Sequence, residues 1–341
     1  MNDVRALNDW VAKESAFVER VLAEVGKVVV GQQTMIERIL IGLLTGGHVL
    51  LEGVPGLAKT TTVRALCDAI SAKFARIQFT PDLLPADITG SEMYYQRDGG
   101  GEFRFDAGPL FANLVLADEI NRAPAKVQAA LLEAMEERQV TVAGTTHPLP
   151  DVFLVMATQN PIETEGTYPL PEAQVDRFMM KVLVDYPTEE EEFVIVQRVT
   201  GAPVAATAVA TTEQLAALQQ TCRQVYVDPS LIQYAVRLVA ATRKPELHDL
   251  KDLSRLITYG ASPRATINLV EGARALAMLR GRSYALPEDM GDLVPDVLRH
   301  RLVLSYEALA EGLNADGLIQ RIMAKINPPA KPLEHAAPTT T

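Results

Sequence analysis

The chain has 341 residues, of which 48% are hydrophobic and 22% are charged, and its formal net charge at pH 7 is -11. This length suggests about two domains with ample room for a buried core, and the composition is close to that of an ordinary soluble protein. The acidic balance argues against a general basic surface for nucleic acid or anionic membrane, although it does not exclude a local basic channel.

The cysteines and the N-terminal segment predict a cytoplasmic protein. Cys67 and Cys222 lie far apart in helix-like segments and show no metal-site spacing, so we expect reduced thiols in the core. The N-terminal segment contains no apolar signal-peptide core, and no run reaches transmembrane length. We therefore expect no membrane insertion.

Apolar segments of strand length alternate with helical patterns in the first half of the chain. Helices are expected at 60–71, after a glycine-rich turn, and at 126–137. Near-continuous apolar strands alternating with helices indicate a parallel sheet covered on both faces. We therefore predict an α/β domain over 1–187. Its expected strands are 48–52, 74–79, 113–119, 152–160 and 179–187.

Two insertions interrupt this series. Residues 90–108 have strand-like halves around a Gly-rich turn, and residues 138–151 have a turn near Gly144, so both are predicted to be β-hairpins. Sheet connections do not need hairpins this elaborate and polar. We therefore expect the hairpins to face a partner or a ligand.

The pattern changes after Pro187. Thr188 and Glu191 have the spacing of a capping box, which predicts the start of a helix. Further amphipathic patterns follow without an intervening strand, so residues 188–327 are predicted to form an all-helical second domain. The last segment, 328–341, has the composition of a disordered tail.

The segment 50–61, "LLEGVPGLAKTT", matches a phosphate-binding loop with one exception. The strict pattern is G-x-x-x-x-G-K-[ST], in which Gly53, Lys59 and Thr60 fit, while Ala58 replaces the second glycine. A strand before the loop and a helix after it let backbone N–H groups converge on phosphate oxygens. We expect Ala58 to begin the helix in an ordinary right-handed conformation. The alternative is a glycine turn that caps an ordinary helix.

The apolar strand "LVLADE" ends in adjacent carboxylates, Asp118 and Glu119. The C-terminal ends of parallel strands line the ligand crevice, which would place both acids toward a nucleotide. Asp118 can hold Mg²⁺ through water, and Glu119 can polarise the water that attacks a phosphate. The alternative is a solvated acidic turn.

Three further residues are candidates for phosphate contacts. Asn160 follows an apolar strand and can orient the attacking water, although turn formation alone also explains it. Arg177 stands at the end of a short helix, where the helix dipole favours a cation in any case. Arg264 follows Ser262 and Pro263, which suit the first positions of a helix. A cation in that first turn is mildly disfavoured, which argues for a contact with an anion elsewhere.

Taken in order, the motifs "GVPGLAKT", "LVLADEINRAP", "ATQNP", "EAQVDRF" and "GASPRA" closely resemble those of the MoxR family of AAA+ ATPases. The resemblance covers about residues 25–325, and alanine is usual at position 58 in that family. It implies an AAA+ nucleotide-binding domain over 1–187, a helical lid over 188–327, and ATP and Mg²⁺ as cofactors.

The same resemblance implies a role for each motif. Lys59 would contact the β- and γ-phosphates as part of Walker A, and Thr60 and Asp118 would ligate Mg²⁺. Asp118 and Glu119 would form Walker B, with Glu119 as the catalytic carboxylate. Val30 and Gly31 would lie beside the adenine. The residues so implied in ATP binding are Val30, Gly31, Gly53, Val54, Pro55, Gly56, Leu57, Ala58, Lys59, Thr60 and Thr61.

The resemblance also implies two sensors and an arginine finger. Asn160 would be sensor 1, and Arg264 would be sensor 2, which acts on the γ-phosphate of its own subunit. Arg177 would reach the γ-phosphate of the neighbouring subunit, which makes catalysis depend on a head-to-tail ring. The family suggests a homohexamer.

The hairpins resemble the helix-2 insertion and the pre-sensor-1 hairpin, which point toward the central pore of such rings. The tip of the first hairpin, "RDGGGE", lacks the aromatic-hydrophobic pair of peptide-threading unfoldases. Remodelling of a partner is therefore expected rather than processive threading.

Three functions follow from these features. The first is a chaperone-type, ATP-driven remodelling motor that works, by family analogy alone, with a von Willebrand factor A domain protein. The second is the motor of a metal chelatase or of a DNA-linked machine, although the first hairpin has only Arg97 and Arg104 to offer DNA. The third is a nucleotide-gated assembly scaffold with little turnover, against which the pair Asp118 and Glu119 argues.

Overall fold

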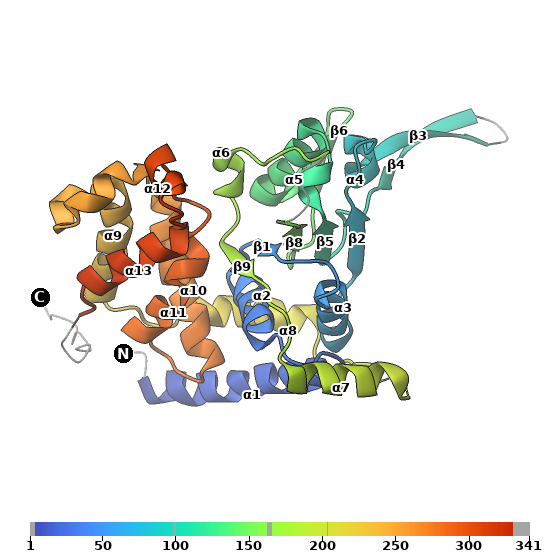
Figure 1. The fold of residues 1–341 in the computed structure, drawn as a ribbon. Helices are drawn as coiled ribbons and strands as arrows, with labels where there is room; N and C mark the ends of the chain where they lie inside the picture. The colour runs from blue at the N-terminus through green and yellow to red at the C-terminus, as the bar shows by residue number, and fades with distance from the viewer. Residues whose placement is uncertain (1–3, 98–99, 162–165, 203, 330–341) are drawn as a thin grey trace, which may run out of the picture. The chain divides into compact units, whose positions relative to one another are not determined.

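The computed structural model describes residues 4–97, 100–161, 166–202 and 204–329, with the backbone alone for 4–15 and 97 (Figure 1). The chain divides into two compact units. The first, here called the sheet unit, comprises Phe17–Phe178 and Val182–Ala217. The second, called the helical unit, falls within Met1–Ala16, Met179–Lys181 and Leu218–Thr341. Residues 330–341 of the predicted tail lie outside the described residues.

A five-stranded sheet has the order β2-β5-β8-β1-β9, and its first four strands lie wholly within the sheet unit. The pairs β2–β5, β5–β8 and β8–β1 are parallel, which confirms the predicted α/β class. Every residue of β1, β5 and β8 except the last is buried, and this explains why these strands are apolar throughout. The strands are β1 (Val49–Glu52), β2 (Phe74–Gln78), β5 (Leu114–Asp118), β8 (Leu154–Gln159) and β9 (Met180–Leu183).

Helices cover both faces of this sheet. On one face, Val127 and Leu131 of α5 share a buried cluster with Val155 of β8. On the other face, α2 approaches β1 and β8 so closely that a Cβ on Gly42 would lie 3.3 Å from Leu154. The helices up to residue 222 are α1 (Val4–Val28), α2 (Gln33–Thr45), α3 (Lys59–Ala69), α4 (Pro85–Thr89), α5 (Ala125–Glu137), α6 (Glu172–Val175), α7 (Glu189–Thr200) and α8 (Thr212–Cys222), with a short 3-10 helix, η1 (Ile120–Arg122).

Both predicted hairpins are present. The first pairs β3 (Gly90–Arg97) with β4 (Gly100–Ala107), and the second pairs β6 (Gln139–Val142) with β7 (Thr145–Pro148). Figure 1 shows the first hairpin extending away from the sheet.

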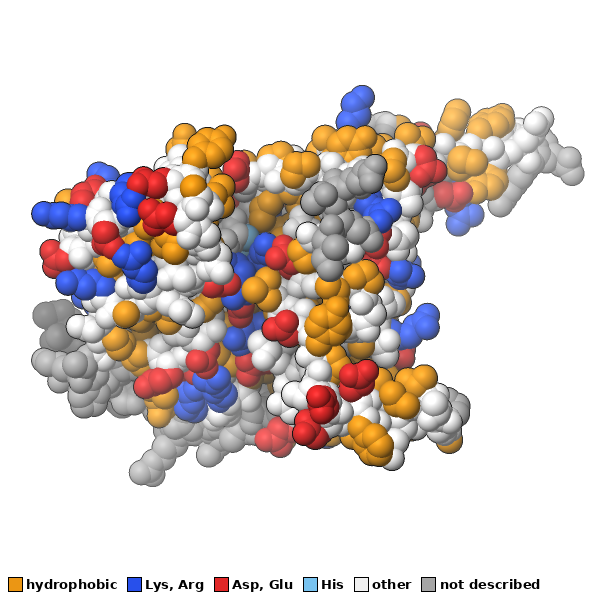
Figure 2. Space-filling view, viewed as in Figure 1, with side chains coloured by type: hydrophobic (Ala, Val, Ile, Leu, Met, Phe, Trp, Pro, Cys, Tyr) orange, Lys and Arg blue, Asp and Glu red, His pale blue; other side chains and the backbone are white. Residues whose placement is uncertain are grey.

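The tip of the first hairpin includes residues 98–99, which lie outside the described residues. Below this tip, Tyr94 and Phe103 pair across the strands with ring centroids 5.2 Å apart, and Phe103 is 71% exposed. Hydrophobic side chains are visible along this arm in Figure 2. The exposed aromatic pair therefore lies on the strands and outside the tip sequence "RDGGGE".

The helical unit contains five α-helices among its described residues from 229 to 329. The predicted apolar faces are buried, with Leu231 and Leu238 in α9, and Leu269 and Leu276 in α10. A short antiparallel ribbon, which the sequence pattern does not predict, also occurs here, because strands of three and two residues are too short to show alternation. The elements are α9 (Pro229–Arg243), η2 (Pro245–His248), η3 (Lys251–Arg255), β10 (Ile257–Tyr259), α10 (Pro263–Leu279), α11 (Pro287–Leu298), β11 (Val303–Leu304), α12 (Tyr306–Ala310) and α13 (Ala315–Lys325).

The remaining general predictions concern the thiols and the membrane. Cys67 and Cys222 are free and buried, and burial raises the pKa of each thiol to about 12. In the part of the chain that the structure describes, no helix is both long enough and apolar enough for a membrane span.

Candidate functional site

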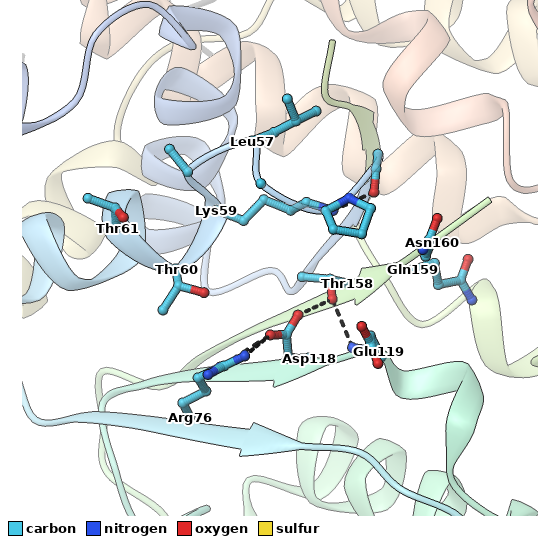
Figure 3. A pocket seen from close by; sticks show the side chains of 14 residues that line it. Leu57, Lys59, Thr60, Thr61, Arg76, Asp118, Glu119, Thr158, Gln159 and Asn160 are labelled. Atoms are coloured by element: carbon cyan, nitrogen blue, oxygen red, sulfur yellow. Dashed lines mark hydrogen bonds and ion pairs between the residues drawn. The ribbon is translucent and has the colours of Figure 1, made fainter. Parts of the chain in front are cut away.

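A pocket of about 360 Å³ lies at the C-terminal edge of the sheet in the sheet unit (Figure 3). It is lined by the loop after β1 and the first turn of α3, by Arg76 of β2, and by the ends of β5 and β8. Of the predicted loop residues, Gly53 and 55–61 line the pocket, whereas Val54 does not. Val30 and Gly31 are not among its lining residues either.

The loop conformation corrects one sequence prediction. Ala58 precedes α3 with φ 56° and ψ 15°, in the left-handed region, and not in the right-handed conformation that we expected. The physical reason is that Ala58 is the residue before the helix, so it makes the turn that ends the loop, and the helix begins only at Lys59. A left-handed alanine costs about 1–2 kcal/mol that a glycine would not incur. The strict loop pattern has glycine at this position for the same reason.

The two glycines of the loop have different physical roles. Gly56 has φ 88°, which glycine adopts without strain. Gly53 is required by close packing instead, because a Cβ there would lie 2.6 Å from the carbonyl oxygen of Val184. The loop is thus pressed against the segment that follows β9.

Lys59 spans the loop. Its Nζ donates a 2.6 Å hydrogen bond to the carbonyl oxygen of Gly53. Burial lowers the pKa of this ammonium, while the charges of Asp118, Glu119 and Glu52 oppose that shift. A half-buried cation flanked by backbone N–H groups is well suited to hold phosphate oxygens.

The two carboxylates lie opposite the loop, at the end of β5. The Thr158 hydroxyl donates to Asp118 Oδ1 at 2.6 Å and accepts the N–H of Glu119 at 2.8 Å. Arg76 donates to Asp118 Oδ2 from Nη2 at 2.6 Å and from Nε at 3.1 Å. Figure 3 shows Asp118 between these two partners. Both oxygens of Asp118 are therefore engaged.

Glu119 has its own partners and a strained backbone. Gln78 Nε2 donates to Glu119 Oε2 at 3.1 Å, and Arg122 Nε lies 2.9 Å from the same oxygen. The backbone φ of Glu119 is 57°, in the left-handed region that a non-glycine residue rarely adopts. This conformation turns the chain sharply at the end of β5 and leaves the carboxylate at the pocket wall.

Sequence reasoning missed four of these residues, namely Arg76, Gln78, Arg122 and Thr158. Arg76 and Gln78 alternate with the buried Ile77 at the end of β2, so both side chains point to one exposed face. Polar residues at alternate positions near the C-terminal end of a strand were the available signal. Thr158 carried no such signal, because an isolated threonine in an apolar strand is ordinary.

The other predicted residues are distributed as follows. Asn160 follows β8, lines the pocket and is 9% exposed. Arg177 follows α6 and lines a different pocket of about 480 Å³, where Nη1 donates to the Leu132 carbonyl at 2.9 Å and Nε lies 3.5 Å from Glu136. Arg264 belongs to the helical unit, in the first turn of α10, which Ser262 caps as predicted. The roles of these residues remain predictions.

The donor set of the pocket fits a hard divalent cation only in company with a nucleotide. Thr60 and Asp118 both line it, and hydroxyl and carboxylate oxygens are the ligands that Mg²⁺ accepts. The described residues form no group of three or more His, Cys, Asp or Glu side chains that could hold a metal. Mg²⁺ at this site would therefore depend on phosphate oxygens, as is usual for that ion.

Comparison with known proteins agrees with this geometry. Residues 48–180 match the ATPase family associated with various cellular activities (AAA), and residues 249–322 match the AAA lid domain. Chaperone MoxR1 of Mycobacterium tuberculosis is 50% identical over 330 residues, which are 97% of this chain and 86% of that protein. Protein MoxR of Paracoccus denitrificans is 34% identical, covering 95% of this chain and 98% of its own.

A solved structure is similar over almost the whole chain. It is that of a Cytophaga hutchinsonii protein described as a candidate ATPase, and it is 47% identical in sequence. The TM-score is 0.89, and the similarity covers 95% of this chain and 98% of the other.

Proposed function

Because the chain belongs to the MoxR family of AAA+ ATPases, we propose that it hydrolyses ATP to ADP and phosphate and uses the energy to remodel partner protein complexes, as a chaperone does. The observation that carries this proposal is the convergence of Lys59, Asp118 and Glu119 on one pocket at the edge of a parallel sheet. Ligands of open α/β sheets bind at such an edge.

We assign the chemistry of the pocket as follows. Lys59 and the N–H groups of the loop hold the β- and γ-phosphates and neutralise their charge. Thr60 and Asp118 would hold Mg²⁺, which would supply further neutralisation of the phosphate charge. Glu119 accepts a hydrogen bond from the attacking water and polarises it, and Asn160 orients that water. Thr158 keeps Asp118 and Glu119 in place.

The proposal includes a ring of subunits, most simply a homohexamer. Arg177 supports it, because its side chain is about one-third exposed in a pocket separate from the one that contains Lys59. An arginine that completes the site of a neighbour would need this accessibility. Arg264 would act on the γ-phosphate of its own subunit, and Val30 and Gly31 would contact the adenine.

Further parts of the proposal rest on composition or on family analogy. The domain limits are taken as 1–187 for nucleotide binding and 188–327 for the lid. A partner with a von Willebrand factor A domain, a cytoplasmic location and the lack of general nucleic-acid binding belong to the same group of predictions.

The function is tested by measuring the ATPase rate per subunit, with Mg²⁺, over a wide range of protein concentration. A specific rate that rises and then levels off supports sites completed between subunits. Glu119→Gln should abolish hydrolysis while it leaves ATP binding intact, because it removes the base and keeps the shape of the side chain. Unchanged turnover in this variant would contradict the assignment. In the wild type, a specific rate that stays low at every protein concentration although ATP is bound would favour the scaffold function.

A further inference from the structure

The ion pair between Arg76 and Asp118 lies inside the pocket that we assign to the nucleotide. Arg76 lines this pocket, and two of its N–H groups converge on a single oxygen, Asp118 Oδ2. The other oxygen, Oδ1, accepts the hydroxyl of Thr158. Thr158 is 2% exposed and also accepts the Glu119 N–H, so it is a fixed part of the wall. Arg76 therefore engages the oxygen that Thr158 leaves available.

Arg76 differs from Thr158 in how firmly it is held. Its side chain is 47% exposed, and it also donates to the side-chain oxygen of Gln78, at 2.9 Å. An ion pair whose cation is this exposed is weak, since water competes for the guanidinium. An arginine side chain is also long and flexible enough to move aside without any change in the backbone of β2.

We propose that Arg76 is an internal counter-cation that competes with the divalent metal for Asp118, so that metal enters the pocket only together with the phosphates of a nucleotide. This inference rests on the proposed metal role of Asp118. Metal on Asp118, directly or through a water molecule, would have to share the carboxylate with a guanidinium, and like charges within a few ångströms repel. The nucleotide phosphates supply the negative charge that outweighs this repulsion.

The inference explains why an arginine occupies a strand position that faces the nucleotide. Glu119 already has an ion pair with Arg122, at 2.9 Å. Arg76 supplies the corresponding counter-charge for Asp118, so that each of the two carboxylates faces an arginine in the nucleotide-free protein. Arg76 is thus a positioning residue for the metal site and not a catalytic residue.

The test measures metal binding at equilibrium and does not depend on hydrolysis. Mn²⁺ serves as the probe, because the electron paramagnetic resonance signal of the free aqueous ion reports the unbound fraction. The full chain without nucleotide is titrated in the wild type and in Arg76→Ala and Arg76→Gln. We expect both variants to bind Mn²⁺ about tenfold or more tightly than the wild type, because a nearby positive charge has been removed.

Three controls make the result specific. Arg76→Lys keeps the charge and should retain weak Mn²⁺ binding. Arg104→Ala removes a charge from β4, outside the pocket, and should leave the Mn²⁺ affinity unchanged. Asp118→Asn in the Arg76→Ala background should abolish the gained binding. Circular dichroism checks that each variant is folded, and Arg76→Gln replaces Arg76→Ala if the shorter side chain prevents folding.

Several outcomes would overturn the inference. These are Mn²⁺ affinities of Arg76→Ala and Arg76→Gln within about twofold of the wild type, tighter binding that survives Asp118→Asn, or an Arg76→Lys variant that behaves like Arg76→Ala. The outcome is separable from the proposed function. A chain that hydrolyses no ATP can still show the shift in Mn²⁺ affinity, and an active ATPase without that shift would refute the role of Arg76 alone.

Discussion

The hydroxyl of Thr158 donates a 2.6 Å hydrogen bond to Asp118 and so joins the ends of two neighbouring strands, β8 and β5. The same oxygen accepts the N–H of Glu119, at 2.8 Å. One buried hydroxyl thus fixes the carboxylate assigned to the metal and the backbone of the residue assigned to the water.

Thr158→Val should therefore impair both folding and hydrolysis. Valine has nearly the shape of threonine but leaves the Glu119 N–H without its acceptor, which should destabilise the protein by about 1–3 kcal/mol. The turnover number should fall about 10- to 100-fold, as for other groups that orient catalytic ligands. Urea unfolding and steady-state kinetics measure the two effects. Thr158→Ser keeps the hydroxyl and should stay near wild type, and a fully active valine variant would contradict the role of this hydrogen bond.

Ala58→Gly should stabilise the protein. The substitution removes about 1–2 kcal/mol of left-handed strain, and the greater chain entropy of glycine stabilises the unfolded state by about 0.4–1 kcal/mol, so the net gain is at most about 1.6 kcal/mol. Gly56→Ala is the matched opposite. Its φ of 88° would strain an alanine, whereas no atom lies within 4 Å of the added Cβ, so any loss there reports backbone strain alone. Urea unfolding of both variants should shift in opposite directions, and a destabilised Ala58→Gly would show that the strain is absent.

Stability should decrease with acidification below pH 6.5 through His48. This ring is 5% exposed, its Nδ1 accepts the Val155 N–H at 2.9 Å, and its Nε2 lies 3.1 Å from the Met135 carbonyl, so the neutral form with a proton on Nε2 satisfies both partners. Burial, aided by the charge of Arg138, lowers the pKa of His48 from 6.5 to about 3. Between these two pH values the unfolded chain binds a proton that the folded chain does not, so folding weakens as the pH falls.

The size of this effect can be isolated with a variant that does not titrate. At pH 5, protonation of His48 in the unfolded state should cost about 2 kcal/mol of stability. Glutamine keeps a donor and an acceptor but does not titrate. Between pH 7.5 and pH 5, the free energy of unfolding of His48→Gln should therefore fall by about 2 kcal/mol less than that of the wild type. Urea unfolding of both proteins at the two pH values measures the difference. An equal pH dependence in both proteins would mean that His48 is protonated in the folded state.

Arg177 is expected to act on the site of a neighbouring subunit. Arg177→Ala and Glu119→Gln should each lack ATPase activity when expressed alone. If the two are co-expressed with different tags and purified through both, roughly a quarter of the sites in a randomly mixed ring should combine an intact Glu119 with an intact Arg177 from the next subunit. Activity should then return. Two differently tagged copies of Arg177→Ala form the control, and mixed rings as inactive as this control would place the arginine in its own subunit's site or outside catalysis.

Much of the fold could be predicted from local patterns. The apolar runs of β1, β5 and β8, the helical face of α5 that contains Val127 and Leu131, and the cap of α10 by Ser262 each depend on residues within a few positions of one another. The phosphate loop was recognisable despite Ala58, since the lysine, the first glycine and the flanking strand and helix were all present. The order of motifs then identified the family, which the comparisons confirm.

The sequence by itself thus determined the main strands and helices, the α/β class, the family and which residue types are available for phosphate and metal. Only the tertiary structure decided that Arg76 pairs with Asp118, 42 positions away, and that Thr158 joins Asp118 to Glu119. It also decided that Gly53 packs against Val184 and that Ala58 is left-handed. The physical reason is that the periodicity of a sequence indicates only which face of an element is buried. The contacts between strands depend instead on the order β2-β5-β8-β1 in which the strands lie side by side, and that order does not follow the chain.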